Sequence, residues 1–324
     1  MTNWPLALAF AFAVQAINPA AAQEFPSRPI KMVIPVPPGG AFDITGRLVA
    51  DRMRASLGQP VIIENVGGAA GNLGVARVVR AAPDGYTVSL GLWTTHVVSG
   101  AIYDLGYDVV KDFEPIGLLA TAPQVIASSN AVPAQDLRGL VAWLKADPGR
   151  ATAATVGAGS PPHVAGILLE RLTRTRVRFV PYRGGALAVQ DLLAGQVDLT
   201  ILQPAVVLPH VRAGKLRAYA VTADARLTGA PEIPTVDEAG VPGLYVSAWS
   251  ALFAPKGTPK EIVAKLNAAV VDALRDPEIK QRFTEMGQEL PPRAQQTPEA
   301  LAALQAAEIA KWWPIIKAAH IEVQ

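Results

Sequence analysis

Apolar and polar positions along the chain alternate between short β-prone runs and longer amphipathic helical runs. From residue 29 the chain reads as a buried strand, a Pro-Gly turn and a helix that Gly58 is suited to end. In this first unit, strands are predicted at residues 29–36, 61–66 and 86–92, and helices at residues 44–57 and 72–81. This βαβαβ order predicts a mainly parallel sheet with helices on its faces.

A second unit follows the same plan further along the chain. Its strands are predicted at residues 151–156, 177–181, 197–202 and 216–222, and its helices at residues 137–145, 163–172, 186–194 and 206–212. The C-terminal part is predicted to be helical over residues 259–274, 277–286 and 298–319. We therefore expect an α/β protein with two separate units.

Two β-prone stretches connect these units. Residues 113–128 form a long apolar run, and residues 245–255 form a second one after a turn-rich segment. If both stretches cross between the units, they make a double hinge, an arrangement that allows closure over a ligand. The expected domains are a signal peptide at residues 1–22, lobe I at residues 23–120 plus 248–324, and lobe II at residues 121–247.

Composition narrows the function classes. The 324 residues suit two domains of ordinary size, and half of them are hydrophobic while 17% are charged, which disfavours disorder. A net charge of +2 and the lack of a prominent Lys or Arg run argue against nucleic acid as the partner. The chain has no cysteine and only four scattered histidines, so thiol chemistry is excluded and a metal cluster is not expected.

The N-terminus has the features of an export signal. Residues 5–17, PLALAFAFAVQAI, make an apolar stretch too short to span a bilayer, and an A-x-A cleavage motif follows at residues 20–22. Residues 1–4 contain no Lys or Arg, which leaves an uncleaved N-terminal anchor as the alternative. We expect a periplasmic protein whose mature chain starts at Gln23 and does not insert stably into the membrane.

The strongest local signal is the loop between the first predicted strand and helix. Adjacent glycines there allow the backbone to approach a ligand, and the helix start favours an anion. The candidate binding residues of this loop are Pro38, Gly39, Gly40, Ala41, Phe42 and Asp43. The alternative is a tight turn with Asp43 capping the helix or paired with Arg47 on the surface. The loop matches neither a P-loop nor a dinucleotide fingerprint, and no cofactor is predicted.

Similar strand-to-helix loops occur elsewhere in the chain. The candidates are Thr94 after the strand at 86–92, Gly159, Ser160, Pro161 and His163 after the strand at 151–156, and Gly184 and Gly185 after the strand at 177–181. Ser160 could bind a carboxylate or only cap its helix, Arg183 could be solvated, and His163 could simply pack at its helix start. Because carboxyl ends of strands are where ligands bind in open α/β sheets, we expect these loops to converge on one site.

These segments together resemble the substrate-binding receptors of tripartite tricarboxylate transporters, the Bug or TctC-type family. The resemblance covers nearly all of the mature chain, and the order and spacing of its motifs carry it. The most specific motifs are VPYRGG at residues 180–185, LAGQVD at 193–198 and GKLR at 214–217. Weaker ones include PPGG at residues 37–40, PDGYT at 83–87, PPH at 161–163, DEAG at 237–240 and PKGTP at 255–259.

The resemblance implies a two-lobed periplasmic-binding-protein architecture, or Venus flytrap, in which the facing loops hold carboxylates. It implies integral membrane permease subunits as partners, and we expect the receptor to be a monomer that is not an enzyme. The chain departs from the family after Thr200-Ile201, where Leu202-Gln203 replaces a common acidic residue, and after Thr95-His96, where Ser99-Gly100 replaces an Asn-Pro pair. Gln203 is therefore a further candidate binding residue, and ligand identity cannot be transferred.

Two other functions remain open from the sequence. A periplasmic sensory receptor would bind the same class of small carboxylates but signal to a membrane kinase. A periplasmic hydrolase or lyase would use His163 or His96, although no paired base, metal set or nucleophile motif accompanies either residue.

Overall fold

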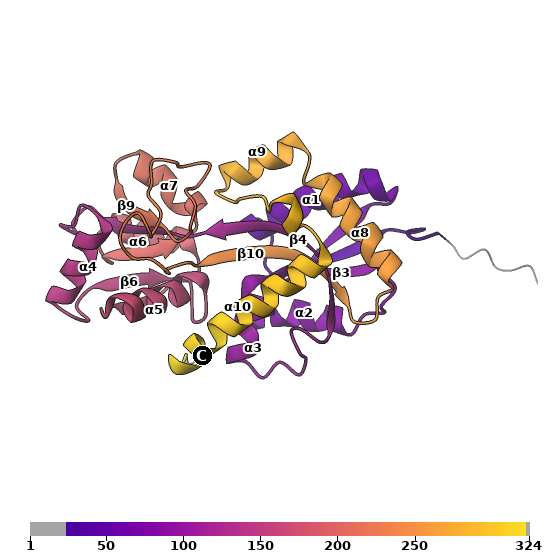
Figure 1. The fold of residues 1–324 in the computed structure, drawn as a ribbon, viewed down its shortest axis with the longest axis horizontal. Coiled ribbons are helices and arrows are strands. Elements are labelled where there is room, and N and C mark those ends of the chain that lie inside the picture. The colour runs from indigo at the N-terminus through magenta and orange to yellow at the C-terminus, as the bar shows by residue number, and fades with distance from the viewer. Residues whose placement is uncertain (1–23, 322–324) are drawn as a thin grey trace, which may run out of the picture.

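The structure is a computed structural model that describes residues 24–321. These residues form two five-stranded sheets, each covered by helices, at the two ends of an elongated molecule (Figure 1). The predicted signal peptide at residues 1–22 lies outside the described residues. Among the described residues, no helix is both long and apolar enough to cross a membrane.

In the first sheet, four strands run in one direction and one runs against them. Its order is β2 (Val61–Asn65), β1 (Ile30–Ile34), β3 (Thr87–Leu92), β10 (Ser247–Pro255) and β4 (Phe113–Pro123). Strand β1 runs parallel to β2 and β3, as predicted, whereas β10 is antiparallel to both β3 and β4. Strand β10 runs against the other four strands because it returns from the other sheet. We call the part of the molecule around this sheet the first lobe.

The helices of the first lobe come from both ends of the chain. They are α1 (Ala41–Leu57), α2 (Asn72–Val79), α3 (Ser99–Ile102), α8 (Lys260–Ala273), α9 (Pro277–Glu285) and α10 (Pro298–Ala318), with short turns at Ala69–Gly71 and Arg293–Gln295. Helix α1 ends as the sequence predicts: Gly58 has a φ of 68°, and its N–H donates to the Arg54 carbonyl. Helices α1 and α8 pack together over a wholly apolar core that includes Met53 and Leu266.

The second sheet has the same mixed arrangement. Its order is β7 (Arg178–Pro181), β6 (Thr152–Thr155), β8 (Leu199–Leu202), β5 (Val125–Ser129) and β9 (Leu216–Val221). Strand β6 is parallel to β7 and β8, and β5 is antiparallel to β8 and β9. The helices around it are α4 (Leu137–Ala146), α5 (Pro161–Thr173), α6 (Gly185–Leu193) and α7 (Pro204–Arg212). This part is the second lobe.

The lobes are joined through two extended crossings that run side by side (Figure 1). Only Gln124 separates β4 in the first sheet from β5 in the second. Thr222 connects the two crossings: its hydroxyl donates to the Val246 carbonyl at 2.6 Å and accepts from the Gln124 N–H at 2.9 Å. The two-lobed α/β fold is thus confirmed, while the lobe boundaries at residues 120/121 and 247/248 stay a prediction.

One element differs from the expectation. Thr94 was expected in a strand-to-helix loop, but residues Thr94–Val98 form a helical segment that continues into α3. Its β-branched residues disfavour helix, but Val97 and Val98 are buried, and the Thr95 hydroxyl bonds the Leu92 backbone. Tertiary packing therefore overrides local propensity at this position.

Candidate functional site

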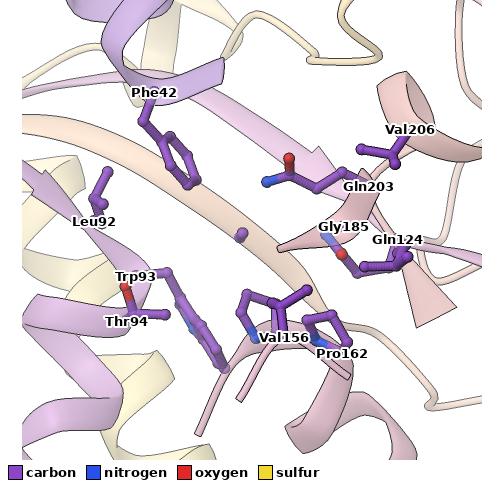
Figure 2. Close-up of a pocket in the computed structure, with 13 residues that line it drawn as sticks. Phe42, Leu92, Trp93, Thr94, Gln124, Val156, Pro162, Gly185, Gln203 and Val206 are labelled. Atoms are coloured by element: carbon purple, nitrogen blue, oxygen red, sulfur yellow. The ribbon is translucent and has the colours of Figure 1, made fainter. Parts of the chain in front are cut away.

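A cavity of about 220 Å³ lies between the two lobes (Figure 2). Phe42 projects into it from the first turn of α1, and Gln203 and Val206 lie on the opposite side, at the start of α7. The complete lining is Phe42, Leu92, Trp93, Thr94, Gln124, Val156, Pro161, Pro162, Gly185, Leu202, Gln203, Val206 and Ala248. Because pockets for drug-sized ligands are about 300–1,000 Å³, this one suits a small solute.

A second cavity of about 370 Å³ adjoins the first and extends the cleft along the first lobe. The two share lining residues, namely Phe42, Leu92, Thr94, Val156 and Pro161. Ser99, Tyr103 and Ser160 add hydroxyl groups to the second cavity. The cleft is therefore one apolar space with polar groups at a few points.

No Asp, Glu, Lys or Arg within residues 24–321 lines either cavity. The polar side chains of the smaller cavity are those of Thr94, Gln124 and Gln203. Those of Thr94 and Gln203 make no hydrogen bond to any residue that the structure describes. The site therefore offers neutral hydrogen-bonding groups and no side-chain counter-charge.

Helix starts provide the electrostatic character of this cavity. Four helices of the described chain begin at its wall: α1 through Phe42, α5 through Pro161 and Pro162, α6 through Gly185, and α7 through Gln203 and Val206. All four follow carboxyl ends of strands, as the sequence predicted. Each helix start carries partial positive charge, so together they favour an anion in the cavity.

The loop before α1 is held by a buried carboxylate. Asp43 is 2% exposed and accepts hydrogen bonds from the Gly39 N–H at 2.9 Å, Arg47 Nε at 2.9 Å and Asn65 Nδ2 at 2.8 Å. Burial by itself would raise the pKa of this carboxyl group, but the three hydrogen bonds outweigh it and lower the pKa to about 2. Asp43 is thus ionised at neutral pH and fixes the loop to both α1 and β2.

The structure brings part of the predicted site together. Phe42, Thr94, Pro161, Gly185 and Gln203 line the smaller cavity, and Gly159 and Ser160 line the larger one. The other candidates line neither cavity in this structure, namely Pro38, Gly39, Gly40, Ala41, Asp43, His163 and Gly184. Whether these residues contact the ligand stays a prediction, as does each individual binding role.

The loop before α5 is occupied with its own hydrogen bonds. The Gly159 N–H donates to His163 Nδ1 at 3.1 Å, and the Ser160 hydroxyl donates to the Gly157 carbonyl at 2.7 Å. Ser160 occupies the N-cap position but makes no side-chain capping bond, so the capping role considered for its hydroxyl is not seen. These bonds hold Gly159 and Ser160 in place at the cleft wall.

Neither candidate histidine has the surroundings of a catalytic base. His96 is completely buried, which lowers its pKa to about 3, and its ring stacks on Phe253. Burial also lowers the pKa of His163, whose ring packs against Phe179 on the outer side of α5. No group of three potential metal ligands occurs within the described residues.

Sequence reasoning missed the residues that form the floor of the cavity. Gln124 and Ala248 lie at or beside strand ends where the crossings meet the first sheet. Gln124 is fully buried, and its Nε2 donates to the Ala122 carbonyl at 2.7 Å. The sequence signal available was their position in or next to the two predicted crossings, because a ligand between two lobes must touch the segments that join them.

Comparison with known proteins places the chain in a family. Residues 45–321 match the tripartite tricarboxylate transporter family receptor, TctC. The chain belongs to this family. This match confirms the resemblance found in the sequence. BugT from Bordetella pertussis is 34% identical to the chain over 301 residues, which cover 92% of this chain and 91% of BugT.

Two solved structures of similar proteins contain organic acids. MatC from Rhodopseudomonas palustris with bound malate is 39% identical, has a TM-score of 0.78, and matches over 90% of this chain and 100% of its own. A second R. palustris protein, with adipate, is 32% identical with a TM-score of 0.80, over 92% of this chain and 99% of its own. This TctC-family chain therefore shares its fold, over at least 90% of its length, with relatives solved with malate or adipate.

Proposed function

We propose that this TctC-family receptor binds a small organic acid between its lobes and delivers it to the membrane subunits of a tripartite transporter. The observation that carries the proposal is the convergence of four helix starts on a cavity without charged side chains. A carboxylate fits this setting because main-chain N–H groups can bind its oxygens while the helix dipoles offset its charge. Malate or adipate bound to the relatives supports the same ligand class.

The mechanism is reversible capture without bond making or breaking. A ligand that enters between the lobes contacts α1 on one side and α5, α6 and α7 on the other, so it stabilises the closed arrangement. Each charge-assisted hydrogen bond contributes roughly 1.5–3 kcal/mol, and several of them allow micromolar affinity, near −8 kcal/mol, after ordering costs are met. We further propose that the receptor acts in the periplasm after its signal peptide is removed.

The ligand class can be tested by calorimetry with matched pairs of compounds. Malate and adipate are titrated into the protein alongside their neutral diamides, which keep size and shape but lack negative charge. At least one acid should bind with micromolar affinity, and its diamide at least tenfold more weakly. If the diamides bind as well as the acids, the cavity does not select for negative charge and the proposal is wrong.

The contribution of α1 can be tested with Gly40→Val. A side chain at Gly40 meets nothing within 4 Å, and its φ of −82° is open to any residue, so the fold should be retained. A branched side chain there should obstruct the approach to the first amides of α1 and weaken acid binding at least tenfold. Ala302→Val, on the exposed side of α10, is the matched control. Unchanged affinity in Gly40→Val would show that the amides next to Gly40 do not bind the acid.

A further inference from the structure

A second concave surface lies outside the cleft, between α5, β7 and the C-terminal end of α10. We call it the arginine groove; it has a volume of about 790 Å³. Its lining is His163, Ile167, Glu170, Arg171, Arg174, Thr175, Arg176, Val177, Phe179, Ile315, Ala318 and Ala319. Figure 1 shows the end of α10 beside α5, at the lower edge of the second lobe. None of the cleft-lining residues belongs to this groove.

The groove brings three arginines together beside a single carboxylate, that of Glu170. Arg171, Arg174 and Arg176 are exposed, and none of them forms an ion pair with any residue in the described part of the chain. Arg178, also exposed, follows on β7. No unbroken Lys or Arg run marks this segment in the sequence, yet the turn after α5 brings the guanidinium groups to one rim.

Glu170 is the one acidic residue of the lining, and it is already engaged. Its Oε1 accepts a hydrogen bond from the Val177 N–H at 2.7 Å, and burial raises the pKa of the carboxyl group. The arginines therefore present their N–H donors to solvent. Guanidinium groups match carboxylates in bidentate geometry, so the complementary partner carries several carboxylates.

The groove also has apolar lining residues. Ile167, Val177 and Phe179 line it from the second lobe, and Ile315 lines it from α10. A partner that fits must therefore combine carboxylates with apolar side chains. A flat membrane surface matches a concave groove poorly, and a small anion would leave most of a groove of this volume empty.

We propose that the arginine groove is a docking site for an acidic, partly apolar segment of a partner protein. The proposal does not depend on which solute the cleft binds. The two walls of the arginine groove belong to different lobes. Helix α10 is fixed to the first lobe by bonds such as that from Trp313 Nε1 to the Val97 carbonyl at 2.9 Å, whereas α5 and β7 belong to the second lobe. The groove is therefore a surface that both lobes shape.

The test measures fluorescence anisotropy of a labelled peptide, Glu-Leu-Glu-Gly-Glu-Leu-Glu, with the full chain at low salt. The expected result is saturable binding that falls at least tenfold in the triple variant Arg171→Gln, Arg174→Gln, Arg176→Gln. A second triple variant, Arg54→Gln, Arg80→Gln, Arg293→Gln, removes the same charge from exposed positions elsewhere and should bind normally. The peptide with Gln in place of Glu should bind at least tenfold more weakly.

Three outcomes would overturn the proposal. One is equal loss of binding in the two triple variants, which indicates a response to net charge alone. Another is no saturable binding to the unmodified chain. The third is that the chain binds vesicles of anionic phospholipid through the three groove arginines, whereas peptide binding is the same with and without these arginines. That outcome would make the groove a membrane contact. Calorimetry of the best organic acid should be unchanged in the groove variant, so failure here is separable from failure of the proposed function.

Discussion

Replacing Asp43 with asparagine tests how the loop before α1 is held in place. The carboxylate of Asp43 is buried and bonded to Gly39, Arg47 and Asn65, and its pKa falls from the ordinary 3.8 to about 2. Each tenfold change in proton affinity corresponds to about 1.4 kcal/mol, so the ionised group stabilises the fold by about 2 kcal/mol at neutral pH. Asparagine keeps the shape but loses this charge.

The pH dependence follows from the sign of that change. Because the folded-state pKa of Asp43 is lowered, its stabilisation is complete above pH 3.8 and is lost as the pH falls through about 2. Urea unfolding should therefore show the Asp43→Asn variant about 2 kcal/mol less stable at pH 7, with a difference that shrinks toward pH 2. Asp51→Asn removes an exposed carboxylate from the same helix and is the control.

The result that would refute this reasoning is a stability difference that stays constant from pH 7 to pH 2. It would mean that packing of the side chain, and not its charge, is responsible. A variant as stable as the unmodified protein at pH 7 would be equally decisive, because it would show that the three hydrogen bonds contribute no net stability.

Two further predictions concern buried groups. Because burial lowers the pKa of His96 from 6.5 to about 3, acidification below pH 6.5 should lower the free energy of unfolding through this residue by about 1.4 kcal/mol per pH unit. The variant His96→Phe, whose ring can still stack on Phe253, should reduce the slope of unfolding free energy against pH by that amount. Equal slopes for the variant and the unmodified protein would contradict the prediction. Ser160→Ala removes the hydrogen bond to the Gly157 carbonyl at the cleft wall. Calorimetry should show organic-acid binding about fivefold weaker, and the free energy of unfolding should change by about 1 kcal/mol. Equal affinity would limit the hydroxyl to a structural role.

Much of the fold was predictable from periodicity. Parallel strands β1, β2 and β3 and the end of α1 at Gly58 follow from apolar spacing and turn residues, because these signals are local. The antiparallel pairing of β10 with β3 and β4 was not, because it depends on chain segments far apart in sequence. The helical segment at Thr94–Val98 was not predicted because its β-branched residues have low helix propensity. Burial against the rest of the lobe explains why it is nevertheless helical.

The part of the candidate site formed by strand-to-helix connections was predictable from the sequence, whereas the part formed by the crossings was less so. Gln203 directly follows a strand, and Phe42 and Gly185 lie at the starts of the helices that follow strands, where a sequence pattern indicates a ligand. Gln124 and Ala248 line the same cavity from the crossings, and no local motif distinguishes them from ordinary strand residues. The Asp43 network likewise depends on Asn65, which lies on a neighbouring strand. Sequence can suggest such partners but cannot place their atoms within bonding distance.

The bond from the Thr222 hydroxyl to the Val246 carbonyl has a mechanical consequence. Since Gln124 alone joins β4 to β5 and is tied to the same threonine, the connection has no slack loop in which a swing could occur. Relative rotation of the lobes must instead change the backbone torsions around Gln124 and act on the contact between Thr222 and Val246. Opening of the lobes to release the proposed acid would therefore require the hydrogen bonds of Thr222 to bend or break.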